Sequence, residues 1–396
     1  MQMGEIGKLP HGGCCRLALT DDDRRGRDLF VQWCRSAGCT VTVDEIGNIF
    51  ARREGSEPSL PAVSCGSHLD TQPHGGKFDG IYGVLGGLEV VRALNVHGIK
   101  TRRPIDVIVW ANEEGSRFPP GLVGSSAFIR SMSTEQVMDL RAKDGGRWGD
   151  ELKRIGYAGP QRAGDRALDS FFELHIEQGP LLENEEKTIG VVKGIQGIRW
   201  FELTVTGQDS HAGTTPLHLR KDALVAAAKM VAEANRIGLA YQPDARVTVG
   251  RLDVVPNGPS TIPGSVFFIL DTRHPDREVL GHIEREMQDA VAQIARQANV
   301  GVQVKPTIDI DPVMFPAECR ELVRHSAEHL GYSHKEMLSG AGHDAMNVAQ
   351  VCPTGMIFVP CRSGLSHNEE EYATPEHLAA GCNVLLHVLV ERANTV

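Results

Sequence analysis

Short, mostly apolar runs alternate with stretches of helical spacing over the first 195 residues. Residues 62–67, 105–110 and 171–176 are rich in apolar side chains without alternation, which is typical of strands buried on both faces. Between the first two runs, residues 81–94 repeat apolar side chains every three or four positions, as one face of a helix does. Strands separated by helices predict an α/β domain with a mostly parallel sheet.

A capped helix and two short strands precede this pattern. Thr20 can cap a helix over residues 21–37, and the acidic run Asp21–Asp23 suits the positive end of its dipole. Segments 40–43 and 48–52 have strand composition on either side of a turn. The sequence therefore predicts a helix followed by two short strands.

The pattern changes after about residue 195. Residues 200–205 alternate apolar and polar side chains, which predicts a strand with one face towards solvent. Helices are expected over 221–236 and 276–297, and further strands over 246–251, 265–271 and 301–306. From about residue 310 the α/β pattern returns, and it ends in a helix that Thr374 can cap. We therefore expect one α/β domain, residues 1–195 and 310–396, interrupted by a smaller α+β domain, residues 196–309.

Charge and cysteine content narrow the class of protein. The chain has 41 basic and 51 acidic residues, a net charge of −10, and so lacks the basic surface of a general nucleic-acid or anionic-membrane binder. No apolar run is long enough to span a bilayer, and the first residues lack the apolar stretch of a secretory signal. The nine cysteines form no CxxC pair. We predict a cytoplasmic protein with no nucleic-acid or membrane partner.

Polar side chains that can bind metal follow the first buried strand. His68 and Asp70 stand where this strand ends, and in an extended chain residues two apart face the same way. The Asp70 carboxylate could then accept the ring N–H of His68 and orient it from behind a metal ion. Asp79, at the start of the next helix, carries two oxygens that could bridge two cations.

The next two strands end in similar residues. Glu113 and Glu114 follow residues 105–110, and two adjacent carboxylates are costly to bury unless a cation or a shared proton offsets them. His175 lies at the end of the third strand. Taken singly, each residue is as well explained by a structural hydrogen bond, a solvated surface or a turn. Their convergence at one edge of a sheet predicts a site for Zn²⁺, with Mn²⁺, Co²⁺ or Ni²⁺ also compatible with nitrogen and oxygen ligands.

Eight segments, in order along nearly the whole chain, carry a family resemblance. The segments are GSHLDTQPHGGKFDGIYGVLGGLEV (66–90), WANEEGSRFPPGLVGS (110–125), ELHIEQGPLLE (173–183), DSHAGTTP (209–216), PNGPSTIPG (256–264), DTRHPD (271–276), GAGHDA (340–345) and LSHNEEE (365–371). Through them the chain resembles the dizinc amidohydrolases of the M20 peptidase superfamily, in the hydantoinase/carbamoylase branch.

The resemblance implies two divalent metal ions per chain and a role for each candidate residue. Asp79 is expected to bridge both ions and Glu113 to act as the free catalytic base. The remaining metal ligands are expected to be His68, Glu114, His175 and His367. His367 lies in a polar stretch that would otherwise be taken for a surface loop.

The inserted domain is implied to serve as a lid and as the interface of a homodimer. His211 is expected to reach the partner's active site and stabilise the oxyanion. Arg273 and Asn257 are expected to hold the substrate carboxylate, since a guanidinium pairs both oxygens. Gln196, Gly340 and Gly342 are further candidates for this pocket. From the residues alone, a strand-end ion pair for Arg273 and a turn position for His211 stay open.

The implied reaction is hydrolysis of the ureido C–N bond of an N-carbamoyl amino acid, L-α or β. Allantoate is the closest alternative, because it also has a ureido group and a carboxylate. A dipeptidase or an aminoacylase would use the same chemistry. A non-catalytic metal scaffold is the alternative from another class, and Glu113 argues against it, because a structural site needs no free carboxylate beside a ligand.

Overall fold

The computed structural model describes residues 2–395, which divide into two units. Unit 1 comprises the chain up to Gly194 and from Met314 onward, and unit 2 is Ile195–Val313. The boundaries expected from the sequence, after residues 195 and 309, lie close to those found after residues 194 and 313. The chain thus passes from unit 1 into unit 2 and back.

Unit 1 is built on a nine-stranded sheet in the order β1-β2-β4-β3-β5-β15-β6-β13, with β14 also pairing with β6. Its strands are β1 (Thr40–Val43), β2 (Ile49–Arg53), β3 (Ala62–His68), β4 (Ile105–Trp110), β5 (Leu168–Ile176), β6 (Ile189–Ile195), β13 (Val313–Met314), β14 (His334–Ser339) and β15 (Thr354–Val359). The pairs β4–β3, β3–β5 and β5–β15 are parallel, whereas β1, β2 and β6 pair antiparallel. The central sheet is therefore mainly parallel, as the sequence predicts.

Two of the helices of unit 1 begin at the capping residues that the sequence predicts. The helices of this unit are α1 (Asp21–Ser36), α2 (Ile81–Val96), α3 (Val123–Phe128), α4 (Thr134–Met138), α5 (Trp148–Ile155), α6 (Leu181–Asn184), α9 (Ala317–His329), α10 (Asp344–Val348) and α11 (Pro375–Asn394), with short 3-10 turns at Met3–Glu5 and Arg362–Gly364. The Thr20 side chain accepts from the Asp23 N–H and that of Thr374 from the His377 N–H, so both predicted caps are confirmed.

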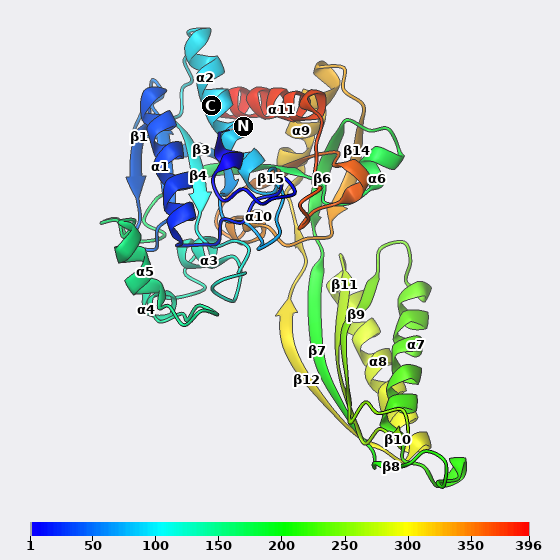
Figure 1. Cartoon of the computed structure of the whole chain (residues 1–396). Helices are drawn as coiled ribbons and strands as arrows, with labels where there is room; N and C mark the ends of the chain where they lie inside the picture. Colours follow the sequence, from blue (N-terminus) through cyan, green and yellow to red (C-terminus); the bar gives the residue numbers. More distant parts are fainter. Residues whose placement is uncertain (1, 396) are drawn as a thin grey trace. The chain divides into compact units, whose positions relative to one another are not determined.

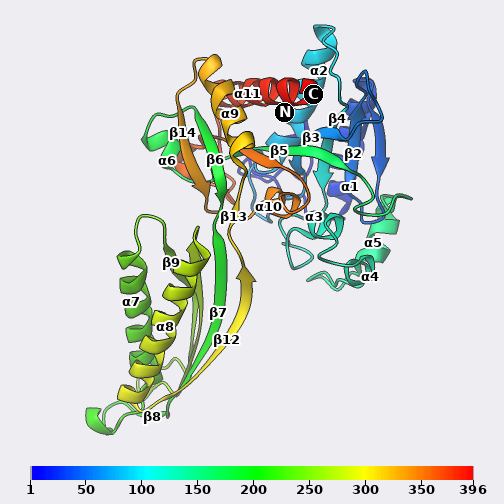
Figure 2. The ribbon, with the colours of Figure 1, turned by 180° about the vertical axis from the view of Figure 1, so that it is seen from behind.

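Helices cover both faces of this sheet. On one face, Gly86 of α2 lies so close to β5 that a Cβ there would come within 2.8 Å of Leu174 Cδ2, and α11 packs against α2 and α9. Figures 1 and 2 show α11, in red, beside α9. On the other face, Glu173 accepts a hydrogen bond from the Ala345 N–H of α10. Because neighbouring residues of a strand point to opposite faces, the two helix layers sandwich the sheet.

Unit 2 is an antiparallel sheet with helices on one face only. Its elements are β7 (Gly197–Thr206), β8 (Ser210–His211), a 3-10 turn at Leu217–Leu219, α7 (Ala223–Ala240), β9 (Arg246–Val255), β10 (Thr261–Ile262), β11 (Ser265–His274), α8 (Arg277–Ala298) and β12 (Gly301–Ile310). The strand order is β12-β7-β11-β9, and β8 pairs with β10 in a separate small sheet.

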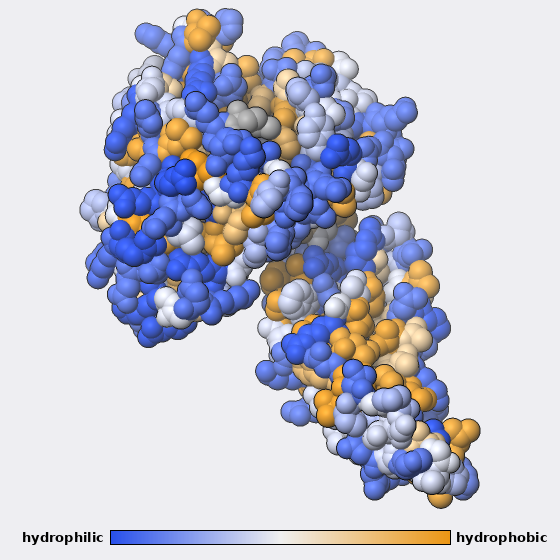
Figure 3. All heavy atoms as spheres, in the orientation of Figure 1, coloured by the Kyte–Doolittle hydropathy of each residue, from blue (hydrophilic) through white to orange (hydrophobic). Residues whose placement is uncertain are grey.

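The alternation expected for unit 2 is confirmed. In β11 every second side chain is buried, among them Val266, Phe268 and Leu270, which pack under α7 and α8. The side chains between them are only half buried, so the opposite face of the sheet is open. Figure 3 shows apolar patches on the surface of this unit, and its exposed apolar residues include Leu217, Leu219, Leu252 and Val255.

Candidate metal centre

The carboxyl ends of three neighbouring strands bring the predicted residues together. His68 ends β3, Glu113 and Glu114 follow β4, and His175 is the second-last residue of β5. Because β3 pairs in parallel with both β4 and β5, these ends lie side by side. Asp79 joins them from the loop before α2.

The Asp79 carboxylate lies between two groups of possible ligands. Its Oδ1 is 3.6 Å from His68 Nε2 and 3.1 Å from His175 Nε2. Its Oδ2 is 3.3 Å from His367 Nε2, which is itself 3.5 Å from Glu114 Oε2. Two sets that could each hold a metal ion, His68–Asp79–His175 and Asp79–Glu114–His367, therefore share one carboxylate.

The two buried histidines each turn Nε2 towards this carboxylate, and His175 Nε2 also accepts from the Gly80 N–H at 3.2 Å. His68 Nδ1 lies 2.9 Å from the backbone oxygen of Asp70, and His175 Nδ1 lies 2.9 Å from that of Ile176. A carbonyl oxygen only accepts, so each Nδ1 carries the proton and each Nε2 is unprotonated in the neutral ring. Unprotonated imidazole nitrogens beside a shared carboxylate form a donor set that fits Zn²⁺ and similar cations.

The prediction that the His68 ring donates to the Asp70 carboxylate is wrong. The Asp70 Oδ1 atom is 3.9 Å from His68 Nδ1, and the backbone oxygen accepts instead. The strand ends at His68, so the alternation of an extended chain no longer applies two residues later. The Asp70 carboxylate accepts from the backbone N–H groups of Glu113 and Glu114, and thereby holds the two glutamates in place.

The two glutamates occupy a crowded, buried and negatively charged position. Burial raises the pKa of Glu113 well above its usual value; the charge of His68 opposes this rise, and the charge of Glu114 adds to it. Burial and the charge of Asp79 raise the pKa of Glu114 to about 7. Burial alone would raise the pKa of Asp79, but His175, His367 and His68, which donate to it from Nε2 when the rings are protonated, hold it well below its usual range. Such a cluster is stabilised by cations.

Glu113 lies beside this cluster and outside both ligand sets. Its Oε2 is 3.6 Å from His68 Nε2, and 11% of its side chain is exposed. Glu114, in contrast, belongs to the second set and accepts a hydrogen bond from Gln72 Nε2. The two adjacent carboxylates thus have different surroundings, and Glu113 is the one left to exchange a proton with a bound molecule.

Several supporting residues lie close to the motifs but were not predicted. Gln178 Nε2 and Ser366 Oγ donate to Asp79 Oδ2 at 2.9 and 3.0 Å. Glu371 accepts from the backbone N–H of Asp79 at 3.1 Å, and its Oε2 lies 2.9 Å from Ser366 Oγ, whose single O–H serves either Asp79 or Glu371. Gln178, Ser366 and Glu371 follow or adjoin His175 and His367 within the quoted segments, which is the only signal the sequence gives for them.

Uncommon backbone conformations are found around the cluster. Asn112, Gln178 and His367 have φ between 54° and 58°, a region that side chains other than glycine rarely adopt. Gly80 has φ +68°, and a Cβ there would lie 2.3 Å from the His68 ring, so only glycine fits beside it.

A third group of possible ligands, Glu173, His175 and His343, has hydrogen-bond partners of its own. Glu173 accepts from Ser67 Oγ and the Ala345 N–H, and His343 Nε2 lies 3.0 Å from Ser339 Oγ. The His343 ring packs 4.6 Å from that of His175. Glu173 and His343 therefore support His175 without a cation.

The other predicted residues lie elsewhere. His211 is exposed in β8, and its Nδ1 accepts from the backbone N–H groups of Gly213 and Thr214. The neutral ring then carries its proton on Nε2. Arg273 of β11 forms an ion pair with Asp271 at 2.8 Å, one of the alternatives left open by the sequence. Asn257 is exposed and has φ 55°.

The three remaining candidates for the substrate pocket are Gln196, Gly340 and Gly342. Gln196, between β6 and β7, is buried, and its Oε1 has no hydrogen-bond partner in the described chain. Gly340 and Gly342 lie in unit 1, in the loop between β14 and α10. His211, Asn257, Arg273 and Gln196 belong to unit 2, whereas all members of the two ligand sets belong to unit 1.

The sequence profile of peptidase family M20/M25/M40 matches residues 65–391. The chain belongs to this family. Its members are hydrolytic enzymes, and the buried cluster lies within the matched region.

Full-length relatives extend this assignment. The chain is 44% identical to an N-carbamoyl-L-amino-acid amidohydrolase of Rhizobium meliloti, over 100% of this chain and 95% of that protein. It is 32% identical to allantoate amidohydrolase of Escherichia coli K12, over 99% and 96%. A solved structure of a hydantoinase/carbamoylase family amidase from Burkholderia multivorans superposes with a TM-score of 0.97 at 53% identity, covering 100% of this chain and 96% of that one.

Within residues 2–395, no helix combines the length and the apolar character that crossing a bilayer requires.

Proposed function

We propose that the chain hydrolyses the ureido C–N bond of an N-carbamoyl amino acid, L-α or β, with two divalent metal ions. Water is consumed, and the products are the free amino acid, carbon dioxide and ammonia. The observation that carries the proposal is the Asp79 carboxylate, shared between two sets of possible ligands with Glu113 beside them. The names of the full-length relatives support the substrate class.

The metal ions would be held by residues of unit 1 alone. Asp79 would contribute to both sites, and the remaining ligands would be His68, Glu114, His175 and His367. Zinc fits this set of nitrogen and oxygen donors, as do manganese, cobalt and nickel. When bound, the ions would polarise the substrate carbonyl and lower the pKa of the attacking water.

Glu113 would move the proton. Its Oε atoms would accept a proton from the attacking water and deliver it to the nitrogen that leaves the ureido carbon. The raised pKa of Glu113, caused chiefly by burial, suits a carboxyl group that must be protonated in the second half of this exchange. Asp70 keeps Glu113 in position, because the Asp70 carboxylate accepts a hydrogen bond from the Glu113 N–H.

Unit 2 would recognise the rest of the substrate. Arg273 and Asn257 would bind the substrate carboxylate, with Gln196 and, from unit 1, Gly340 and Gly342 as further contacts. His211 of the partner subunit would donate its Nε2–H to the oxyanion, a role that suits a ring whose Nδ1 is occupied by backbone N–H groups. Unit 2 would thus act as a lid and as the dimer interface.

We also infer a cytoplasmic homodimer. The nine cysteines, all within the described chain, are free thiols, which suits a reducing compartment. The edge strand β9 of unit 2 and exposed side chains such as Leu252 and Val255 offer a surface that a second copy could cover.

Allantoate is the alternative substrate. It carries both a ureido group and a carboxylate, and the Escherichia coli relative is named for it. A dipeptidase or an aminoacylase would use the same cluster on a different amide. A panel of N-carbamoyl-α-amino acids, N-carbamoyl-β-alanine, allantoate and N-acyl amino acids, run with each of the four metals, separates these activities.

The test of the mechanism is Glu113→Gln. We expect kcat to fall by about 10²–10⁴-fold, the usual contribution of a general base, while two metal ions per chain are retained. Metal content is measured by mass spectrometry and turnover by ammonia release. Glu336→Gln, an exposed position on β14, is the matched control and should leave both unchanged. Full turnover in Glu113→Gln would contradict the mechanism.

A further inference from the structure

A polar cavity lies in unit 1, at the opposite end of the sheet strands from the metal centre. It has a volume of about 550 Å³, within the range of small-molecule sites. Its wall includes Arg52 of β2 and Arg166, two residues before β5 begins. Arg52 pairs across the sheet with Asp106, the second residue of β4. The cavity therefore starts at the amino ends of β4 and β5, whereas the candidate ligands stand at their carboxyl ends.

Two guanidinium groups at this cavity share a single buried carboxylate. Arg52 donates to both oxygens of Asp106, at 2.8 and 3.0 Å, and Arg166 donates to Asp106 Oδ2 at 2.8 Å. The Asp106 side chain has no exposed surface, whereas those of Arg52 and Arg166 are 24% and 16% exposed. One positive charge is left over, in a chain whose net charge is −10.

The remaining acidic groups of the wall are engaged elsewhere. Asp44 turns its carboxylate inward, onto the backbone N–H groups of Ile46, Gly47 and Asn48. Asp165 is bound by Arg130 at 2.8 Å. Neither carboxylate accepts from Arg52 or Arg166, so the surplus charge is available to a visiting anion.

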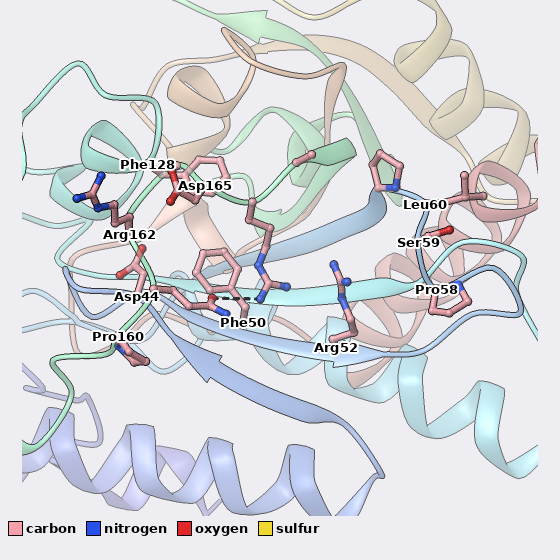
Figure 4. Close-up of a pocket in the computed structure, with 15 residues that line it drawn as sticks. Asp44, Phe50, Arg52, Pro58, Ser59, Leu60, Phe128, Pro160, Arg162 and Asp165 are labelled. Atoms are coloured by element: carbon pink, nitrogen blue, oxygen red, sulfur yellow. Dashed lines mark hydrogen bonds between the residues drawn. The ribbon is translucent and has the colours of Figure 1, made fainter.

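Arg52 keeps a donor for such an anion. Its Nε and Nη2 atoms are used on Asp106, and its Nη1 donates to no residue of the described chain. In Figure 4, Arg52 rises from its strand between Phe50 and the loop that carries Pro58, Ser59 and Leu60. The guanidinium thus borders the cavity and is held in one orientation by its bidentate pair.

Part of the wall is apolar, and it lies beside the polar side chains of Ser59, Gln161, Arg162 and Asp165. Phe50 and Phe128 are buried with their rings 6.1 Å apart, and the Arg166 guanidinium lies 4.6 Å from the Phe50 ring centroid. Pro58 and Pro160 are part of the wall on the two sides of the cavity. A preformed apolar wall beside a fixed cation suits a ligand with one charged end and one apolar end.

We propose that this cavity binds a small organic oxyanion, a carboxylate or a phosphate monoester on a compact apolar body. The oxyanion is held by Arg52 Nη1 and by the surplus charge of the Arg52–Asp106–Arg166 group. The apolar body lies against Leu60, Phe128 and the neighbouring prolines. This site is separate from the metal centre and does not depend on the proposed reaction.

The test is titration calorimetry on the metal-loaded full-length protein. The probes are benzoate, phenyl phosphate, inorganic phosphate and benzyl alcohol. We expect benzoate or phenyl phosphate to bind at least tenfold more tightly than benzyl alcohol, which lacks the charge, and than inorganic phosphate, which lacks the apolar body. Tighter binding of benzoate would indicate a carboxylate site, and tighter binding of phenyl phosphate would indicate a phosphate-ester site.

Variants separate this cavity from the metal centre. Arg52→Gln should weaken the binding of the stronger probe at least tenfold, whereas Arg236→Gln, an exposed arginine of α7 that is paired with one glutamate, should leave it unchanged. Ser59→Glu adds a negative charge to the exposed loop without touching the ion pairs, and should weaken binding if Arg52→Gln fails to fold.

A crystal grown with 4-bromobenzoate locates the probe directly. Bromine scattering in the cavity beside Arg52, together with weakened binding in Arg52→Gln or Ser59→Glu, supports the proposal. Equal affinity in the wild type and both variants, bromine only at the metal centre, or no binding of either aromatic anion would overturn it.

Discussion

In unit 1 the central strands are buried on both faces, and in unit 2 one face of each long strand is open. Most of the candidate residues follow the same division, although His367 of unit 1 is exposed and Gln196 of unit 2 is buried. His68, Asp79 and His175 are almost fully buried and fixed by several hydrogen bonds, whereas His211 and Asn257 lie on the surface. A buried position costs solvation but gives fixed geometry, which bond-breaking chemistry needs. An exposed position can adapt to a substrate or a partner. We therefore expect unit 1 to carry out the chemistry and unit 2 to recognise the substrate or partner, and the following predictions test this division.

Removal of the metal ions should have the largest effect on activity, and it should change the structure of unit 1 directly but not that of unit 2. A chelator is expected to abolish turnover, and added Zn²⁺, Mn²⁺, Co²⁺ or Ni²⁺ should restore it. The melting temperature should also fall, because Asp79, Glu113 and Glu114 lose the cations that offset their mutual repulsion. Activity assays and calorimetry measure both effects. Full activity in protein that mass spectrometry shows to be metal-free would contradict the assignment of the chemistry to a metal site in unit 1.

A pair of phenylalanines compares the two sheets directly. Phe172 of β5 is fully buried, and Phe172→Ala should cost about 3–5 kcal/mol of unfolding free energy. Phe267 of β11 is half buried on the open face, with the Arg251 guanidinium 4.9 Å from its ring centroid, and Phe267→Ala should cost about 1 kcal/mol. Hydrogen exchange during denaturation resolves the two units. Equal costs would mean that the open face is covered in solution.

His211 tests whether unit 2 takes part in the chemistry of a second subunit. His211→Ala should lower kcat by about 10²–10³-fold, the usual loss on removing an oxyanion donor. Mixing His211→Ala with Glu113→Gln chains should restore part of the activity, because one site of the heterodimer has both residues intact. Steady-state assays after demonstrated subunit exchange measure this. An absence of recovery would place His211 outside the shared site.

Arg273 should give the smallest of these effects. Arg273→Lys keeps the charge but loses the two-pronged geometry, and we expect kcat/KM to fall by about tenfold, mainly through KM. A substrate analogue without a carboxylate should be hydrolysed equally by both enzymes. Arg251→Lys, an exposed arginine of β9 paired with Asp253, is the matched control. The same loss with both substrates would assign Arg273 to the ion pair with Asp271 instead.

Local patterns in the sequence predicted most of the secondary structure. The caps at Thr20 and Thr374, the buried strands and the alternation in unit 2 each depend on a few neighbouring residues, so they can be seen in a single sequence. The sequence also predicted that His68, Glu114 and His175 converge, because parallel strands bring their carboxyl ends together. His367 was named only through the family resemblance, since nothing in its polar surroundings distinguishes it from a surface loop.

The tertiary structure decided which atoms meet. Glu371 lies 292 residues from Asp79 in sequence, yet it holds the backbone N–H of Asp79, and Asp70 reaches the N–H groups of Glu113 and Glu114 rather than the ring of His68. The Arg52–Asp106–Arg166 group likewise joins three distant segments. The sequence alone determined the helices, the strands and the chemistry available, because these depend on neighbouring residues. Contacts between distant segments were settled only by packing, because they depend on where each strand ends and how the loops turn.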